Sequence, residues 1–312
     1  MNKYNLQKKN NFSAYLCIAA MIIMVLRSKP VINSAAEALS MCVRSVIPSL
    51  FPFIAASNIL VGCTDGSTFR ILSKPLSAIF KISSASATAV VCGILCGCPV
   101  GASCAATLYK RNMISKSEAE TLIAFTSNSG AMFVIGTVGC GMLGSQSAGA
   151  ILYAVHLLSA VFCACIMRPF TVPSKPHCTK NRADSLSITD AVANASVTML
   201  KICGFIVVFA VICEILYPAV CLLPYKMRGC AYAVPELTNG VRNINIYGSS
   251  LREKMILSAA ALGWSGLSIH MQVMSVAKPA GLSMKKFYAA KIAGCVFSAI
   301  LCAVITAVVS AN

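Results

Sequence analysis

Two short polar segments interrupt apolar stretches of the sequence and carry residues suited to binding a small polar molecule. Ser127-Asn128-Ser129-Gly130 lies in the middle of one stretch, and Ser265-Gly266-Leu267-Ser268 lies in the middle of another. A helix that breaks inside a membrane exposes backbone N–H and C=O groups, which are tolerated where they line a cavity. We therefore expect a broken helix at each segment, with the break lining a binding site.

Two further segments are rich in turn-forming residues and predict re-entrant hairpins. In the first, Gly97-Cys98-Pro99-Val100-Gly101 and Ser103 sit between two short apolar runs, and in the second, Pro235-Glu236-Leu237-Thr238-Asn239-Gly240 is centred in a polar segment. Glycine and proline this close together favour a turn between two half-length helices. Glu236 at the second tip could bind a coupling cation or proton, although an exposed loop carboxylate is the alternative.

The hairpin tips and the breaks together give the candidate substrate-binding or ion-binding residues. They are Gly97, Pro99, Gly101, Ser103, Ser127, Asn128, Ser129, Gly130, Glu236, Thr238, Asn239, Gly240, Ser265, Gly266, Ser268, His270 and Gln272. The alternative is that the breaks are kinks packed by neighbouring helices, with His270 serving as a satisfied interhelical histidine.

We expect neither an enzyme nor a metal or cofactor site. Gly263-Trp264-Ser265-Gly266 fits the serine loop of rhomboid-type proteases, but His270, the downstream candidate base, is only five residues away on the same segment. The 17 cysteines contain no CxxC pair and have no matching histidine cluster.

The composition places these segments in a membrane. Of 312 residues, 57% are hydrophobic and only 11% are charged, against about 25% charged in soluble domains. We predict an all-α polytopic membrane protein with about seven transmembrane helices plus two re-entrant hairpins. The expected spans cover residues 12–26, 36–61, 118–140, 146–167, 188–217, 255–276 and 287–309, and those at 118–140 and 255–276 are broken.

The net charge of +17 is best explained by cytoplasmic loops, where Lys and Arg are retained during insertion. We therefore expect no nucleic-acid partner, and some of the excess could serve an anionic substrate. With the N-terminus inside and two opposed hairpins, most basic residues fall in inner segments, including those at 70–81, 110–116, 168–182 and 278–286.

A recurring spacing predicts an inverted repeat. Gly93 and Gly229, Pro99 and Pro235, and Gly130 and Gly266 are each 136 residues apart, which pairs turn with turn and break with break. We expect an N-terminal transmembrane anchor at 1–30, a first repeat at 31–168 and a second, inverted repeat at 169–312.

Several motifs resemble the sporulation integral membrane protein YlbJ family, which belongs with the nucleoside-recognition, or Gate, domain proteins. They are Ser49-Leu50-Phe51-Pro52-Phe53, Gly97–Ala102, Glu118-Ala119-Glu120, Asn128–Gly130, Glu236–Gly240 and Gly266–Val273. The resemblance covers roughly residues 36–285. It implies an inverted-repeat transporter fold like the core of concentrative nucleoside transporters, and a role in endospore formation.

The function implied is a multi-pass membrane transporter of a small anionic or heterocyclic metabolite, with dipicolinic acid carried across the outer forespore membrane. Exposed helix N-termini and the basic excess suit a small dianion. Nucleoside transport and a non-transporting organiser of a sporulation complex are the alternatives. The expected partners are the small-molecule substrate, the lipid bilayer and a coupling cation or proton, and a homo-oligomer stays open.

Overall fold

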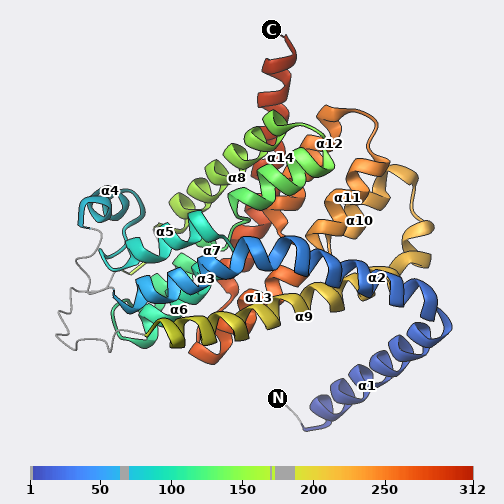
Figure 1. Cartoon of the computed structure of the whole chain (residues 1–312), viewed down its shortest axis with the longest axis horizontal. Helices are drawn as coiled ribbons and strands as arrows, with labels where there is room; N and C mark the ends of the chain where they lie inside the picture. The colour runs from blue at the N-terminus through green and yellow to red at the C-terminus, as the bar shows by residue number, and fades with distance from the viewer. Residues whose placement is uncertain (1–2, 64–69, 169–170, 173–186, 312) are drawn as a thin grey trace.

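The computed structural model describes residues 3–63, 70–168, 171–172 and 187–311, and these residues form helices and no strands (Figure 1). The first half contains α1 Lys3–Leu26, α2 Ser28–Met41, a wide π-type turn η1 Cys42–Val46, α3 Ile47–Gly62, α4 Arg70–Phe80, α5 Ser86–Cys96, α6 Val100–Lys110, α7 Lys116–Thr126, a π-type helix η2 Met132–Met142 and α8 Gln146–Met167. The second half contains α9 Ile188–Cys221, η4 Tyr225–Met227, α10 Arg228–Ala233, α11 Leu237–Tyr247, α12 Leu251–Trp264, α13 Gly266–Ala277, η5 Lys278–Ala280 and α14 Lys285–Ala311.

The helices confirm a membrane-embedded all-α protein. Three of them are long and apolar enough to cross a bilayer: Gln146–Met167, Ile188–Cys221 and Lys285–Val308. A fourth span is added if Ala14–Leu26 and Ser28–Val46, which meet at an angle of 96°, count as one. The other expected spans consist of shorter helices, so the count of about seven stays a prediction.

Both predicted hairpins are helix-turn-helix units. Helices α5 and α6 pack on each other across the turn at residues 97–99, and α10 and α11 do so across the turn at residues 234–236. The second unit is helical even though its sequence is polar enough to be a loop. Figure 1 shows the first hairpin at the left of the molecule and the second at the right, with α13 between them.

Both predicted helix breaks are present. Helix α7 ends at Thr126, and the chain is helical again from Ala131, directly before η2, so the four residues 127–130 lie outside the helices. Helix α12 ends at Trp264, and Ser265 has a left-handed φ of 73°, which turns the chain before α13 begins. A left-handed residue ends an α-helix because the next N–H no longer points at the carbonyl one turn earlier.

The helices after the two hairpin turns recur along the chain with the spacing that the sequence suggested. Helices α6, α7, η2 and α8 begin within three residues of the positions 136 residues before the starts of α11, α12, α13 and α14. The proposed boundary between the repeats, at 168 and 169, adjoins residues 169–170 and 173–186, which lie outside the described residues together with Lys175, Lys180 and Arg182.

Matching caps begin the two broken helices. The Ser115 hydroxyl accepts the N–H of Glu118 at 3.1 Å at the start of α7, and the Ser250 hydroxyl accepts the N–H of Glu253 at 3.2 Å at the start of α12. The fully buried Glu118 carboxylate in turn accepts bonds from the Ser83 N–H and the Ser86 hydroxyl, both at 2.5 Å, at the entry to α5. These bonds fix the spacing between the first hairpin and the first broken helix.

The apolar core contains two large clusters, each of which combines helices of both halves. One buried cluster joins the first hairpin and α7 to α3 and α9, and another joins η2 and α8 to the second hairpin and α12. Helices α2 and α3 lie along α9, while α1 projects from the bundle (Figure 1). Arg27 anchors the bend between α1 and α2, because its guanidinium donates to the Glu214 carboxylate at 2.6 Å and to the Glu214 carbonyl at 2.7 Å.

The turn of the first hairpin depends on Gly97. Its φ is 77°, and a Cβ at this position would lie 2.6 Å from the backbone nitrogen of Gly130. We expect Gly97→Ala to destabilise the protein by about 2–3 kcal/mol and to lower its melting temperature by about 5 °C. Thermal unfolding of the purified protein in detergent measures the change.

Gly204→Ala is the matched control, since a Cβ at Gly204 meets nothing within 4 Å. Equal melting temperatures for the two variants would contradict the close approach of the first turn to the first break.

Candidate functional site

A cavity of about 480 Å³ lies where the two hairpins and the two breaks meet. This volume is in the range of small-molecule sites. Its wall includes Cys98 and Glu236 from the hairpin turns, Asn128 from the first break and Ser268 from the start of α13. Segments far apart in the sequence therefore share one site.

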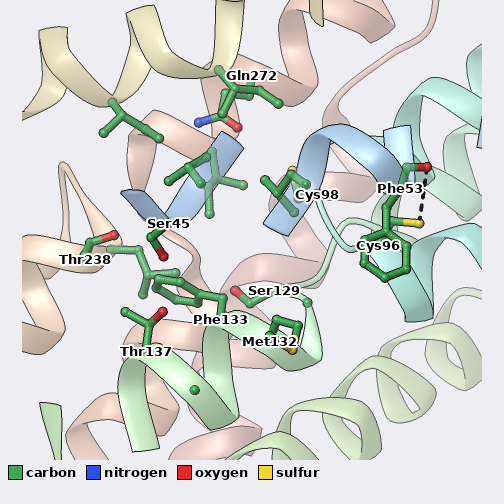
Figure 2. Close-up of a pocket in the computed structure, with 18 of the residues that line it drawn as sticks. Ser45, Phe53, Cys96, Cys98, Ser129, Met132, Phe133, Thr137, Thr238 and Gln272 are labelled. Atoms are coloured by element: carbon green, nitrogen blue, oxygen red, sulfur yellow. Dashed lines mark hydrogen bonds between the residues drawn. The ribbon is translucent and has the colours of Figure 1, made fainter. Parts of the chain in front are cut away.

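The cavity wall is largely apolar with a few polar groups. Leu50, Phe53, Phe133, Ile202 and Ile206 supply much of the apolar surface, and the polar side chains are Arg44, Ser45, Asn128, Ser129, Thr137, Glu236, Thr238, Ser268 and Gln272. In Figure 2, Thr238, Ser45 and Ser129 lie along one side of the cavity and Gln272 lies at the top of the view. A wall of this kind can enclose a flat ring and orient polar substituents on it.

The first break is held by the first hairpin. The carbonyl of Asn128 accepts the N–H of Cys98 at 2.6 Å, and the Asn128 side chain donates to the carbonyl of Phe125 at 2.5 Å, near the end of α7. The N–H of Ser129 donates to Nε2 of the buried His156 on α8 at 3.0 Å. Backbone groups that the helix leaves unpaired at this break thus find partners in the hairpin turn and in a neighbouring helix.

The second hairpin holds the second break, but here the hydrogen bonds run in the opposite direction, from N–H groups of the break to carbonyls of the hairpin turn. The N–H groups of Leu267 and Ser268 donate to the carbonyls of Val234 and Pro235 at 2.9 and 3.0 Å. Gly266 allows this contact, because its φ is 72° and a Cβ there would lie 2.8 Å from the nitrogen of Leu237. The hairpin turn therefore caps the beginning of α13.

Glu236 lines the cavity and also caps its own helix. Its two carboxylate oxygens accept the N–H groups of Thr238 at 3.0 Å and Asn239 at 2.6 Å. A carboxylate at a helix N-terminus is stabilised by the positive end of the helix dipole. Helix α11 thus stabilises the charge of Glu236, and the availability of this carboxylate to a coupling cation or proton stays a prediction.

Lys291 on α14 joins the two breaks, although the hairpin-and-break pattern does not select it. The side chain is 3% exposed, and its ammonium donates to the carbonyl of Ser127 at 2.6 Å and to the hydroxyl of Ser265 at 3.0 Å. A lysine near the beginning of a long apolar helix is typical of an interfacial residue, and only tertiary packing brings this one to residues 127 and 265.

The structure divides the candidate residues into two groups. Those that line the cavity are Asn128, Ser129, Gly130, Glu236, Thr238, Ser268 and Gln272. Those that lie outside its lining are Gly97, Pro99, Gly101, Ser103, Ser127, Asn239, Gly240, Ser265, Gly266 and His270.

The second group supports the site rather than lining it. Gly97, Gly101, Gly240 and Gly266 allow close backbone approaches, and Ser127 and Ser265 bind Lys291. His270 is bound through Nε2 to the carbonyl of Trp264 at 2.8 Å. Ser103 lies in a second cavity of about 530 Å³ between α3, α6, α9 and α13, beside Lys110, Arg111 and Lys201.

Arg44 is a cavity residue that the hairpin-and-break pattern does not select. The ion pairs of the described residues join Arg27 to Glu214 and Arg242 to Glu37. Arg44 therefore faces the cavity without a carboxylate partner from that part of the chain. A charge inside an expected span is the signal that points to it.

Ser265 and Lys291 have the spacing of a nucleophile and a base, but not the access. Their polar atoms are 3.0 Å apart, as in a serine–lysine pair. Ser265 is only 1% exposed, its hydroxyl donates to the carbonyl of Leu262, and it lies outside the cavity lining. The described residues also contain no group of three or more His, Cys, Asp or Glu side chains that could hold a metal ion.

Comparison with known proteins connects this architecture to sporulation. No protein-family model matches the chain, and no solved structure matches it. The nucleoside-recognition part of the resemblance thus stays a prediction. The chain is 26% identical over 339 aligned positions to the sporulation integral membrane protein YlbJ of Bacillus subtilis (strain 168), covering 95% of this chain and 83% of the relative.

That alignment extends from one end of the bundle to the other and so includes both hairpins, both breaks and the helices that hold them. Similarity over nearly the whole chain supports the resemblance to the YlbJ family of sporulation integral membrane proteins that the motifs indicated.

Proposed function

We propose that the protein is a transporter of a small anionic metabolite, dipicolinic acid during endospore formation, and that the cavity between the hairpins and the breaks is its substrate site. The observation that carries the proposal is the convergence of both hairpin turns and both breaks on one cavity of about 480 Å³. Interrupted helices around a central site are the arrangement that secondary transporters use.

The charges of the cavity favour an anion. The Glu236 carboxylate is compensated by the N–H groups of Thr238 and Asn239, whereas the Arg44 guanidinium has no carboxylate partner among the described residues. A guanidinium can bind a carboxylate through two parallel hydrogen bonds. The apolar wall, with Phe53 and Phe133, suits the faces of a planar ring.

The second cavity supports an anion path to this site. Both cavities border α3, α9 and α13, and the second is displaced along these helices toward the open end of the first hairpin. Lys110, Arg111 and Lys201 line it, together with Asn58 and other polar side chains. Three cations at the entrance would raise the local concentration of an anionic substrate.

Alternating access follows if the two halves form an inverted repeat in the membrane. The recurring helix starts and the placement of the hairpins at opposite ends of the molecule support this arrangement (Figure 1). Rocking of one half against the other would expose the cavity to each side in turn. In this proposal the protein acts in the outer forespore membrane.

Cysteine labelling tests the inversion. In a variant whose exposed native cysteines are replaced by serine, we expect Asn112→Cys, after the first hairpin, to react only from the cytoplasmic side. Ser249→Cys, after the second hairpin, should react only from the opposite side, because inverted hairpins return to opposite membrane faces. Labelling of both positions from one side would refute the inversion.

In the proposed transporter, the Arg44 guanidinium should determine the preference of the cavity for an anionic substrate. We expect Arg44→Gln to lower uptake of labelled dipicolinate into proteoliposomes about tenfold, which corresponds to about 1.4 kcal/mol of lost binding. Lys278→Gln is the control, since Lys278 is exposed and outside the cavity lining. A panel that includes uridine as competitor identifies nucleoside transport if uridine, and not dipicolinate, is accumulated.

Asn128 and Glu236 should be needed for transport but not for insertion. We expect Asn128→Ala and Glu236→Ala to abolish uptake, because each removes a side chain that lines the cavity and leaves backbone groups next to it unpaired. Glu37→Ala, at an exposed ion pair, is the control. Normal uptake by both cavity variants, with normal amounts of protein in the membrane, would exclude the proposed site.

A wild-type protein that accumulates no tested metabolite would favour a non-transporting organiser of a sporulation complex.

A further inference from the structure

We infer that the ammonium of Lys291 is a built-in cation that occupies the position where a coupling metal ion would bind, so that this protein needs no Na⁺ or K⁺ at the breaks. The inference rests on the proposed transport function for its biological meaning, but its structural part can be tested without transport.

The position is defined by two helix C-terminal ends. Helix α7 ends just before Ser127, whose carbonyl accepts from Lys291 at 2.6 Å, and α12 ends just before Ser265, whose hydroxyl accepts at 3.0 Å. The C-terminal end of a helix carries partial negative charge. In transporters with broken helices, such ends and unwound carbonyls bind the coupling cation.

The charge of Lys291 has no carboxylate to balance it. The ion pairs of the described residues involve other side chains. The ring centroid of Phe287 lies 5.5 Å from the ammonium, and the thiols of Cys98 and Cys163 also lie near it. A buried charge destabilises a protein unless it is compensated. The two helix ends are the groups placed to compensate it.

The titratable groups near the ammonium are His156, His270 and the thiols of Cys98 and Cys163, and none of these four is a carboxylate. His156 accepts the Ser129 N–H through Nε2, so its bonded nitrogen carries no proton, and His270 is bound to the Trp264 carbonyl. Lys291 therefore supplies the positive charge at the meeting point of the breaks. Because it is covalently attached, it stays at the breaks without an ion gradient.

Thermal stability separates a built-in cation from an ordinary core residue. We expect wild-type protein to melt at the same temperature in NaCl, KCl and N-methylglucamine chloride at equal ionic strength. Lys291→Ala should melt about 5 °C lower and should recover about half of this loss in methylammonium chloride or NaCl, which refill the vacated position. Lys285→Ala, at an exposed lysine of the same helix, should match the wild type in every salt.

Two further variants keep the test decisive if Lys291→Ala does not fold. Lys291→Arg preserves the charge and should stay within about 2 °C of the wild type, whereas the neutral Lys291→Met should lose about 5 °C. Equal melting temperatures of Lys291→Arg and Lys291→Met would overturn the inference, because the positive charge would then make no difference to stability. A specific Na⁺ or K⁺ requirement of the wild type would also overturn it.

Uptake measurements keep this inference distinct from the proposed function. If wild-type proteoliposomes accumulate dipicolinate equally well with and without Na⁺ and K⁺ gradients, both are supported. Uptake that needs a Na⁺ gradient overturns the built-in cation and leaves transport standing. The absence of uptake, with the stability pattern above, overturns transport and leaves the cation assignment standing.

Discussion

The need to satisfy backbone groups where helices stop inside an apolar bundle governs this structure. Each broken helix leaves N–H and C=O groups that cost several kcal/mol if buried without partners. The hairpin turns meet part of this need, since Cys98 donates to Asn128 at the first break and Val234 and Pro235 accept from Leu267 and Ser268 at the second. The hairpins must therefore reach the breaks, and this requirement brings four distant segments of the chain together.

Two buried charged side chains, Glu236 and Lys291, also lie at helix ends. The Glu236 carboxylate sits at the beginning of α11, where N–H groups point outward, and the Lys291 ammonium sits where α7 and α12 end, where carbonyls point outward. Each buried charge is thus matched to a helix dipole rather than to an oppositely charged side chain. Arg44 also lines the cavity, and its guanidinium has no carboxylate partner among the described residues.

In the proposed transporter, a site built from both halves would couple substrate binding to motion. The cavity wall includes residues from the first hairpin and break and from the second hairpin and break, so a rigid-body shift of one half changes the shape of the wall. Lys291 lies behind this wall and contacts both breaks. A tether of this kind would keep the breaks together while the surrounding helices rearrange, which is what a fixed central site requires.

The sequence by itself determined the helical membrane class, both hairpin turns and both breaks, because these depend on local chemistry. Apolar runs specify burial in lipid, and Gly97, Pro235 and Ser265 with its neighbours are poor helix formers wherever the chain places them. The tertiary structure alone decided which of these residues face the cavity. Gly97 and Ser265 pack against backbone or bind Lys291, whereas Ser129 and Thr238 line the cavity. Lys291 is a charge inside the expected span at 287–309, but only the packing of α14 against α7 and α12 brings its ammonium to their ends.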